Sequence, residues 1–288
     1  MILVTGATGH VGSQVIANLG QAGVACRALV RSPERADDLR GYDAEIVVGN
    51  FAEPESLDDA LRGVTAALLV SPPVPQQISW ETTFIDAAAR APVPPHIVKV
   101  ASIAAAPDAP YHFGRTHGEI IETLRSSWVP YTVLAPNGYL QNLEAQAVSI
   151  ARDGILAMPG GDAVISQIDV RDVAAAAAAV LIEPAGHADQ TYDLTGPEPL
   201  SYTDIAQIFS QVVGRPVRYV DVPVDDARAG MVADGMPGWL VDALLDLAAF
   251  YRTGAASVVS GDVERLTGRK PRSVEDFVRD HPAVFAVV

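Results

Sequence analysis

The chain has 288 residues, of which 49% are apolar and 19% charged, so it can bury a large core and is not expected to be disordered. Its formal net charge of -15 repels phosphate backbones and anionic lipid surfaces, which argues against nucleic acids and membranes as partners. The single cysteine, Cys26, cannot form an internal disulfide, and no basic segment ahead of an apolar run suggests a secretion signal. We therefore expect a cytoplasmic protein.

The first 170 residues alternate short β-branched runs with helical patterns. This alternation is typical of repeated βαβ units and predicts an α/β fold, a doubly wound parallel sheet of the Rossmann type. The predicted strands are ILVTG (2–6), ACRALVR (25–31), AEIVVGN (44–50), AALLVS (66–71), HIVKVAS (96–102) and YTVLAP (131–136). The predicted helices are VGSQVIANLGQAG (11–23), SPERADDLRG (32–41), PESLDDALRG (54–63), ISWETTFIDAAARA (78–91) and GRTHGEIIETLRSS (114–127).

After residue 136 the pattern is looser and predicts a smaller, mainly helical C-terminal lobe. Its elements are a helix at 137–154, a strand and an alanine-rich helix within 155–184, a strand at 190–196, a helix at 200–214, a strand at 216–223, and further helices to the end. We expect a first domain at 1–136, which segments at about 163–197 rejoin. The lobe is expected to comprise 137–162 and 198–288.

The opening stretch MILVTGATGHVG places three glycines between the first strand and the first helix. A turn without side chains lets backbone N–H groups approach a ligand, and the helix N-terminus favours a pyrophosphate there. We therefore expect a dinucleotide at this first βα turn. The spacing is G-x-x-G-x-x-G rather than G-x-G-x-x-G, so an ordinary glycine turn is the alternative. The contacts assigned to the turn are Gly6, Thr8, Gly9, His10, Val11 and Gly12.

The end of the second strand indicates which dinucleotide is bound. An acidic residue at this position binds the ribose 2′-hydroxyl of NAD, whereas an arginine accommodates the 2′-phosphate of NADP. Here VRSPERA provides Arg31, Ser32 and Arg35, which favours NADPH. The alternative is that both arginines are solvated surface charges.

Six segments carry a more specific signal. They are TGATGHVG (5–12), LVRSPERA (29–36), VGNFAEPESLDDALRGVTAALLVS (48–71), HGEIIETLRSSWVPYTVLAPNGYLQNL (117–143), IDVRDVAAAAAAVL (168–181) and TYDLTGPEPLSYTDIAQIFSQVVGRPV (191–217). In these segments the chain resembles the NmrA-like atypical short-chain dehydrogenase/reductase family, and within it the bacterial NAD(P)H:quinone oxidoreductase and triphenylmethane reductase group. The resemblance implies that the first domain binds NADPH, that the lobe binds the substrate, and that quinoid or conjugated aromatic compounds are reduced.

The resemblance also implies cofactor contacts at the ends of the later strands. Family members often end the third strand in Gly-Asp, whereas this chain has Gly49-Asn50, so the contact to adenine is expected to be weakened or replaced. The implied contacts are Asn50 and Phe51 after the third strand, Ser71 and Pro72 after the fourth, Ser102 after the fifth, and Pro136 and Asn137 after the sixth.

Catalytic side chains are less well defined. The wider superfamily uses a serine and a Tyr-x-x-x-Lys pair, for which this chain offers Ser102 and the near match Tyr111-x-x-x-Arg115. Tyr111 follows Pro110, however, and is expected to precede the helix. His117 lies where some NmrA-like reductases have a lysine and others a histidine, so it is a candidate general acid or positioning group. The alternative is an ordinary helix histidine.

The substrate residues are expected in the lobe, where aromatic and methionine side chains suit flat ligands. The candidates are Tyr139, Asn142, Met231 and Trp239, with Met236 and Phe250 beside them, although each is also compatible with an ordinary core position. The histidines show no metal-ligand spacing, since His112 and His117 are five residues apart and do not share a helix face, so no metal is expected.

Three functions fit these patterns. The first is an NADPH-dependent reductase that transfers a hydride to a quinone or another conjugated aromatic small molecule. The second is a non-catalytic NmrA-type redox sensor that binds NADP and acts through a protein partner. The third is a biosynthetic ketone, enone or epoxide reductase of the same fold. The chain is expected to be a monomer or a homodimer.

Overall fold

A parallel sheet of seven strands forms the centre of the protein. The computed structural model describes residues 1–285, so the last three residues of the expected lobe lie outside it. The strand order is β3-β2-β1-β4-β5-β6-β9, and every neighbouring pair is parallel. The strands are β1 (Ile2–Val4), β2 (Cys26–Val30), β3 (Ala44–Val48), β4 (Ala66–Leu69), β5 (His96–Val100), β6 (Tyr131–Pro136) and β9 (Gln190–Leu194). The predicted Rossmann-type sheet is therefore confirmed, with the order reversing next to β1, where such folds bind nucleotides.

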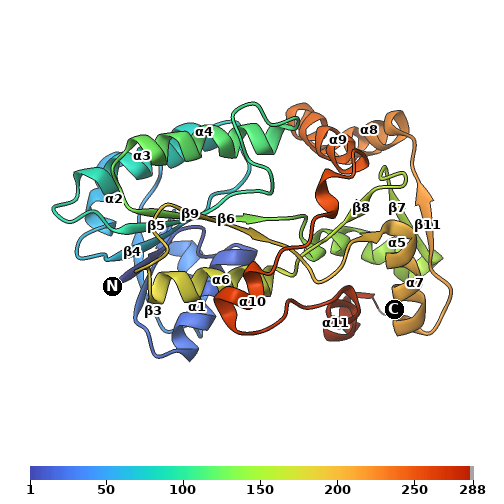
Figure 1. Ribbon diagram of the computed structural model, residues 1–288, viewed down its shortest axis with the longest axis horizontal. Coiled ribbons are helices and arrows are strands. Elements are labelled where there is room, and N and C mark those ends of the chain that lie inside the picture. Colours follow the sequence, from blue (N-terminus) through green and yellow to red (C-terminus); the bar gives the residue numbers. More distant parts are fainter. Residues whose placement is uncertain (286–288) are drawn as a thin grey trace.

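Helices cover both faces of the sheet (Figure 1). On one face α1 (His10–Gln21) packs against α6 (Val170–Ile182). On the other, α3 (Gln77–Arg90) lies between α2 (Pro54–Ala60) and α4 (His112–Ser126). The segment predicted as a helix at 32–41 forms the 3-10 helix η1 (Pro33–Leu39) instead, because an apolar pattern over so few residues does not separate the two helix types.

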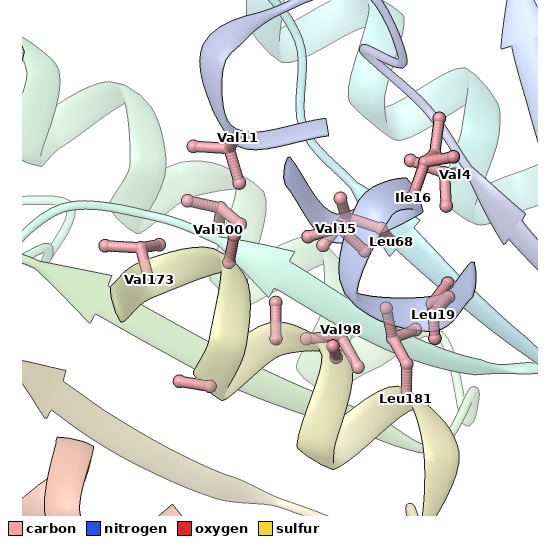
Figure 2. Packing of buried hydrophobic residues seen from close by; sticks show 14 of the residues in the cluster. Val4, Val11, Val15, Ile16, Leu19, Leu68, Val98, Val100, Val173 and Leu181 are labelled. Atoms are coloured by element: carbon pink, nitrogen blue, oxygen red, sulfur yellow. The ribbon is translucent and has the colours of Figure 1, made fainter. Parts of the chain in front are cut away.

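The central strands β1 and β4 are wholly apolar because both of their faces are buried, whereas the outer strands β3 and β9 are partly exposed and carry charged or polar residues. Figure 2 shows the face toward α1 and α6, where Val4, Leu68 and Val98 of the sheet share one buried cluster with Val15 and Leu181. The alternate residues of the same strands belong to a second cluster on the side of α3 and α4. The alanines of α6 let that helix lie close to α1, and most of them are fully buried.

The later segments form a lobe beyond one end of the sheet (Figure 1). Its two small sheets pair β7 (Ile155–Met158) with β11 (Arg218–Asp221), and β8 (Val164–Ile165) with β10 (Leu200–Ser201). The remaining elements are η2 (Leu140–Gln146), α5 (Ala147–Asp153), α7 (Tyr202–Val213), α8 (Val224–Ala233), α9 (Gly238–Arg252), η3 (Ala255–Ser257), α10 (Asp262–Thr267), α11 (Val274–Asp280) and α12 (Pro282–Phe285). No helix within residues 1–285 has the length and apolarity needed to span a membrane.

Ion pairs attach the end of the chain to α6. Arg171 lies 2.6 Å from both Asp169 and Asp280, and Asp172 bonds the backbone and the guanidinium of Arg272. Asp169 also caps α6 by accepting from the Arg171 backbone N–H. These charged residues therefore hold the tail against the sheet domain.

Candidate functional site

At two positions of the first βα turn, no residue larger than glycine fits. Gly6 has a φ of +56°, and a Cβ there would lie 2.8 Å from Val70 Cγ1. A Cβ on Gly12 would lie 2.2 Å from the Gly6 carbonyl oxygen, which is backbone and cannot move aside. The glycines therefore let the start of α1 lie directly on the turn.

The start of α1 is open to a ligand. Gly9 is the N-cap and has no side chain to accept from the first-turn N–H groups. The backbone N–H groups of His10 and Val11 have no acceptor within the helix, so they carry the partial positive charge of the helix N-terminus. This arrangement can bind a pyrophosphate through its backbone.

The arginines after β2 lie beside this turn and differ in their bonding. Arg35 Nη2 donates to Thr8 Oγ1 at 3.1 Å and pairs with Asp38 Oδ2 at 3.1 Å, so it is tied to the glycine turn. Arg31 is exposed and forms no ion pair with the described residues. Its guanidinium is therefore available to a phosphate, next to Ser32 at the start of η1.

Asn50 and Phe51 follow β3 and have different surroundings. Asn50 Oδ1 accepts from the Ala52 backbone N–H at 3.0 Å, so this side chain stabilises its own loop. The Phe51 ring lies between Trp80, 6.5 Å away and stacked, and Phe84, 5.8 Å away and edge-on. Phe51 thus provides a half-buried aromatic surface at the end of β3.

A charged pair that sequence reasoning missed lies behind Ser71. Lys99 in β5 and Glu81 in α3 are both fully buried, and Lys99 Nζ lies 2.7 Å from Glu81 Oε2. Glu81 Oε1 accepts from Ser71 Oγ at 2.7 Å and from Gln77 Nε2 at 3.2 Å. Burial lowers the pKa of Lys99, and the Glu81 carboxylate opposes that shift. The pair fixes Ser71 at the carboxyl end of β4.

The sequence contained a signal for this pair. Lys99 interrupts the otherwise apolar strand HIVKV, in which both neighbours are buried valines. Glu81 has helical spacing with Phe84, Ile85 and Ala88, so it lies on the apolar face of α3. A buried lysine and a buried carboxylate on adjacent elements must pair to avoid a large desolvation cost.

The structure brings together two of the catalytic candidates. Tyr111 Oη lies 3.0 Å from Ser102 Oγ and also contacts the Ile103 carbonyl, and the Tyr111 ring stacks on Phe250 at 4.4 Å. Burial raises the pKa of Tyr111, whose side chain is 1% exposed. As expected, Tyr111 precedes α4. Arg115 instead donates to the Ala109 carbonyl and pairs with Asp246 at 3.1 Å.

His117 faces the sheet from α4. Its Nδ1 atom is buried and has no hydrogen-bond partner among the described residues. Burial, and then the positive charge of Lys99, lower the pKa of His117 well below its ordinary value. The imidazole is therefore neutral at physiological pH and suited to hydrogen bonding rather than to strong acid catalysis.

Hydrogen bonds fix the end of β6 to the loop after β5 and to η3. The Pro136 carbonyl accepts from the Ile103 N–H, and Asn137 Nδ2 donates to the Ala256 carbonyl at 2.8 Å. Tyr139 follows two residues later and is partly exposed, and burial alone strongly raises the pKa of its hydroxyl. The hydroxyl of Tyr139 thus remains protonated.

The other substrate candidates lie farther along the lobe. Asn142 is exposed on η2. Met231 is half-buried on α8, and Trp239 lies 6.4 Å from His112 at the start of α4. No aromatic contact joins Trp239 to Tyr139 within residues 1–285. In the same range, no three His, Cys, Asp or Glu side chains gather as metal ligands do.

Comparison with known proteins identifies the family. The model of the NmrA-like family matches residues 1–278 of the chain. The chain belongs to the NmrA-like family. The resemblance in the sequence is thereby confirmed over nearly the full length.

Three relatives are similar over their whole length. An NAD(P)H azoreductase of Xenophilus azovorans is 38% identical over 285 residues, which are 99% of each chain. A (4-alkanoyl-5-oxo-2,5-dihydrofuran-3-yl)methyl phosphate reductase of Streptomyces griseus is 38% identical over 289 residues, again 99% of each. The crystal structure of an NADPH-dependent quinone oxidoreductase from Escherichia coli, complexed with NADPH, matches with a TM-score of 0.89 at 29% identity, and covers 97% of this chain and 99% of that one.

Proposed function

We propose that this NmrA-like protein is an NADPH-dependent oxidoreductase that transfers a hydride to a quinone, an aromatic azo compound or a similar conjugated acceptor. The open glycine turn at the start of α1 is the observation that carries the proposal, because its backbone donors suit a pyrophosphate. The named activities of the azoreductase and quinone oxidoreductase relatives support the acceptor class.

The nucleotide is held by residues at the carboxyl ends of the strands. The free guanidinium of Arg31 suits the 2′-phosphate, and the aromatic surface of Phe51 suits the adenine ring. Bound NADPH supplies the hydride from C4 of its nicotinamide ring. The remaining proposed contacts are Asn50, Ser71, Pro72, Ser102, Pro136 and Asn137, and segments 1–136 and 163–197 make up the nucleotide-binding domain.

The chain contributes positioning more than acid catalysis. His117 is neutral and can donate or accept one hydrogen bond toward the ligand. The Tyr111 hydroxyl already contacts Ser102 and the Ile103 carbonyl, so its role is to orient Ser102. Holding the two reacting atoms about 3–3.5 Å apart in a dry site accounts for much of the rate that such a site can give. Tyr139, Asn142, Met231 and Trp239 remain the proposed substrate side chains of the lobe.

Reduction of a furanone phosphate is the second candidate, because that relative is as similar as the azoreductase. A phosphorylated substrate needs a free cation in the lobe. Arg115, in α4, is already paired with Asp246 at 3.1 Å, and Arg252, at the end of α9, is paired with Asp221 at 3.2 Å. This pairing leaves neither of these two arginines free to bind a phosphate.

The test is oxidation of NADPH by the purified protein, followed by the loss of its nicotinamide absorbance. Menadione, methyl red and a phosphorylated furanone are compared as acceptors, each with NADPH and with NADH. We expect turnover with menadione or methyl red and a preference for NADPH. Tight binding of NADP⁺ without reduction of any acceptor would contradict the proposal and favour the redox sensor.

A further inference from the structure

Two buried polar side chains near the end of β6 have no hydrogen-bond partner among the described residues. Gln167, between β8 and α6, is 6% exposed, and its Oε1 atom is unpaired. Tyr251, near the end of α9, is 9% exposed, and burial and neighbouring tyrosines, but no hydrogen bond, affect the pKa of its hydroxyl. We call Gln167 and Tyr251 the lobe-side pair.

Both members of the lobe-side pair lie against Gly138. A Cβ built on Gly138 would lie 2.7 Å from Tyr251 Oη and 3.8 Å from Gln167 Cγ. Gly138 is the second residue after β6, and its carbonyl accepts from the Ile168 N–H. The two polar groups therefore flank the carboxyl end of a central strand, the edge where nucleotide-binding sheets hold their ligands.

The surrounding backbone is rigid. Asn137 bonds the Ala256 carbonyl with its amide nitrogen and the Gly138 N–H with its amide oxygen. Ser166 donates its backbone N–H to the same Ala256 carbonyl, and a Cβ on Gly196 would lie 2.0 Å from the Gln167 carbonyl oxygen. The strand end, the lobe-side pair and η3 thus form one fixed frame.

The unpaired amide oxygen of Gln167 is costly where it is buried in this rigid frame, and the Tyr251 hydroxyl beside it makes no hydrogen bond with the described residues. A buried polar group without a partner costs about 1–3 kcal/mol relative to a paired one. The aromatic neighbours Tyr111 and Phe250 offer no replacement, because the Tyr111 hydroxyl already bonds Ser102 and Ile103. A bound molecule that carries a lone pair and lies against Gly138 would remove the cost.

We propose that the lobe-side pair is the polar part of the acceptor site, in which the Tyr251 hydroxyl donates a hydrogen bond to the atom of the acceptor that becomes negative on reduction. This inference rests on the proposed reductase function. The acceptor is an aromatic azo compound or quinone whose reacting N=N or C=O group is uncharged, since the pair itself carries no charge. The Gln167 amide binds a second polar atom of the same ligand and so fixes its orientation.

The chemistry requires a donor at this place. When the hydride bonds to one nitrogen of an N=N group, the π electron pair moves to the other nitrogen, which becomes negative; when a quinone accepts a hydride, the electron pair moves through the ring and the negative charge resides on a carbonyl oxygen. A fixed donor in an apolar site stabilises that charge strongly. Burial, and the nearby hydroxyls of Tyr202, Tyr111 and Tyr139, raise the pKa of Tyr251, so its hydroxyl keeps its proton. The proton that completes the reduction therefore comes from solvent water.

The test compares Tyr251→Phe with Tyr219→Phe as a matched control. Tyr219 is another tyrosine of the lobe, but its hydroxyl donates to the Met158 carbonyl and accepts from the Gly160 N–H. We expect Tyr251→Phe to keep or raise the melting temperature, to keep the dissociation constant for NADP⁺, and to lower kcat/KM for menadione and methyl red by about 10- to 100-fold, as loss of a hydrogen bond to a developing charge does. Tyr219→Phe is expected to lower the melting temperature and leave kcat/KM unchanged.

A binding measurement adds a readout without turnover. Methyl red titrated into the NADP⁺-loaded protein is expected to bind more weakly to Tyr251→Phe and to Gln167→Met than to the wild type. Wild-type turnover with unchanged kinetics and binding in Tyr251→Phe would overturn the inference and leave the reductase function standing. A lower melting temperature with unchanged kinetics would make the hydroxyl structural. Absence of any turnover in the wild type would overturn both proposals.

Discussion

Two sets of buried polar side chains lie near the carboxyl ends of the strands, and they differ in their bonding. The sheet-side set, Ser71, Glu81 and Lys99, is paired within itself. The lobe-side pair, Gln167 and Tyr251, is 6% and 9% exposed and makes no side-chain hydrogen bond with the described residues. Paired groups contribute to the fold, whereas unpaired groups reduce stability and are therefore the better candidates for ligand contacts.

The largest effect is expected from breaking the sheet-side set. Lys99→Met leaves the Glu81 carboxylate buried without its counter-charge, 2.7 Å from the site of the lost ammonium. We expect the free energy of unfolding to fall by about 3–5 kcal/mol, measured by urea denaturation. The double variant Lys99→Met/Glu81→Gln removes both charges and is expected to recover much of the loss. Equal stability of Lys99→Met and the wild type would show that the pair is not part of the folded core.

A substitution at the glycine turn separates cofactor binding from general stability. The Cβ of Gly12→Ala would lie 2.2 Å from the Gly6 carbonyl oxygen, so the turn and the start of α1 must move apart. We expect the dissociation constant for NADPH, measured by nicotinamide fluorescence, to rise about 100-fold, equivalent to about 2.7 kcal/mol. Gly20→Ala is the control, because its Cβ meets nothing within 4 Å. It is expected to stabilise the same helix by about 0.5–1 kcal/mol without changing NADPH affinity.

Removing the free arginine tests the choice of cofactor. Arg31 is exposed and unpaired among the described residues, whereas Arg40, at the end of the same segment, pairs with Asp37 at 2.8 Å. We expect Arg31→Ala to reduce the preference for NADPH over NADH about tenfold, through the KM for NADPH, since one charge-assisted contact is lost. Arg40→Ala should leave the preference as it is. If Arg40→Ala instead lowered the preference for NADPH tenfold, the 2′-phosphate would have to bind beyond η1.

The sheet and the glycine turn could be predicted because their signals are local. Buried parallel strands read as apolar runs, and the glycine turn lies between an apolar run and a helix pattern in consecutive residues. The same reasoning found the strand 190–196 and the fold class, whereas the family came from the resemblance of whole segments. It did not distinguish η1 from an α-helix, because a single short segment carries too few periodic positions.

The site beyond the turn could be predicted only in part. Lys99 and Glu81 each break an apolar pattern, so their pairing could have been predicted from the sequence. Tyr251 and Gln167 break no pattern, because a tyrosine and a glutamine are ordinary residues at a helix end and beside a short strand. Only the packing of α9 against Gly138 shows that the Tyr251 hydroxyl lies beside the strand end and that the Gln167 Oε1 atom is buried there without a partner among the described residues.

The smallest effect is expected in the pH dependence of stability, and it links His117 to the sheet-side set. The folded-state pKa of His117 lies well below its ordinary value of about 6.5, so the unfolded chain binds more protons as the pH falls through that value. The free energy of unfolding should therefore decrease from about pH 7 toward pH 5, by at most about 1.4 kcal/mol per pH unit for one group. Urea denaturation across this range should give a smaller slope in His117→Asn. The slope that remains is expected from His96, whose pKa burial also lowers.

The cause of the shift can be tested as well. Burial is the larger cause and the charge of Lys99 the smaller one, so Lys99→Met/Glu81→Gln should raise the pKa of His117 without restoring its ordinary value. The ring carbon proton of His117, followed by NMR across the same pH range, reports this pKa directly. An unchanged pKa in the double variant would show that the ammonium has no influence on the imidazole, and His117 would then have to be treated as independent of the sheet-side set. A higher pKa would show that the buried pair, besides fixing Ser71, keeps His117 neutral at the proposed cofactor site.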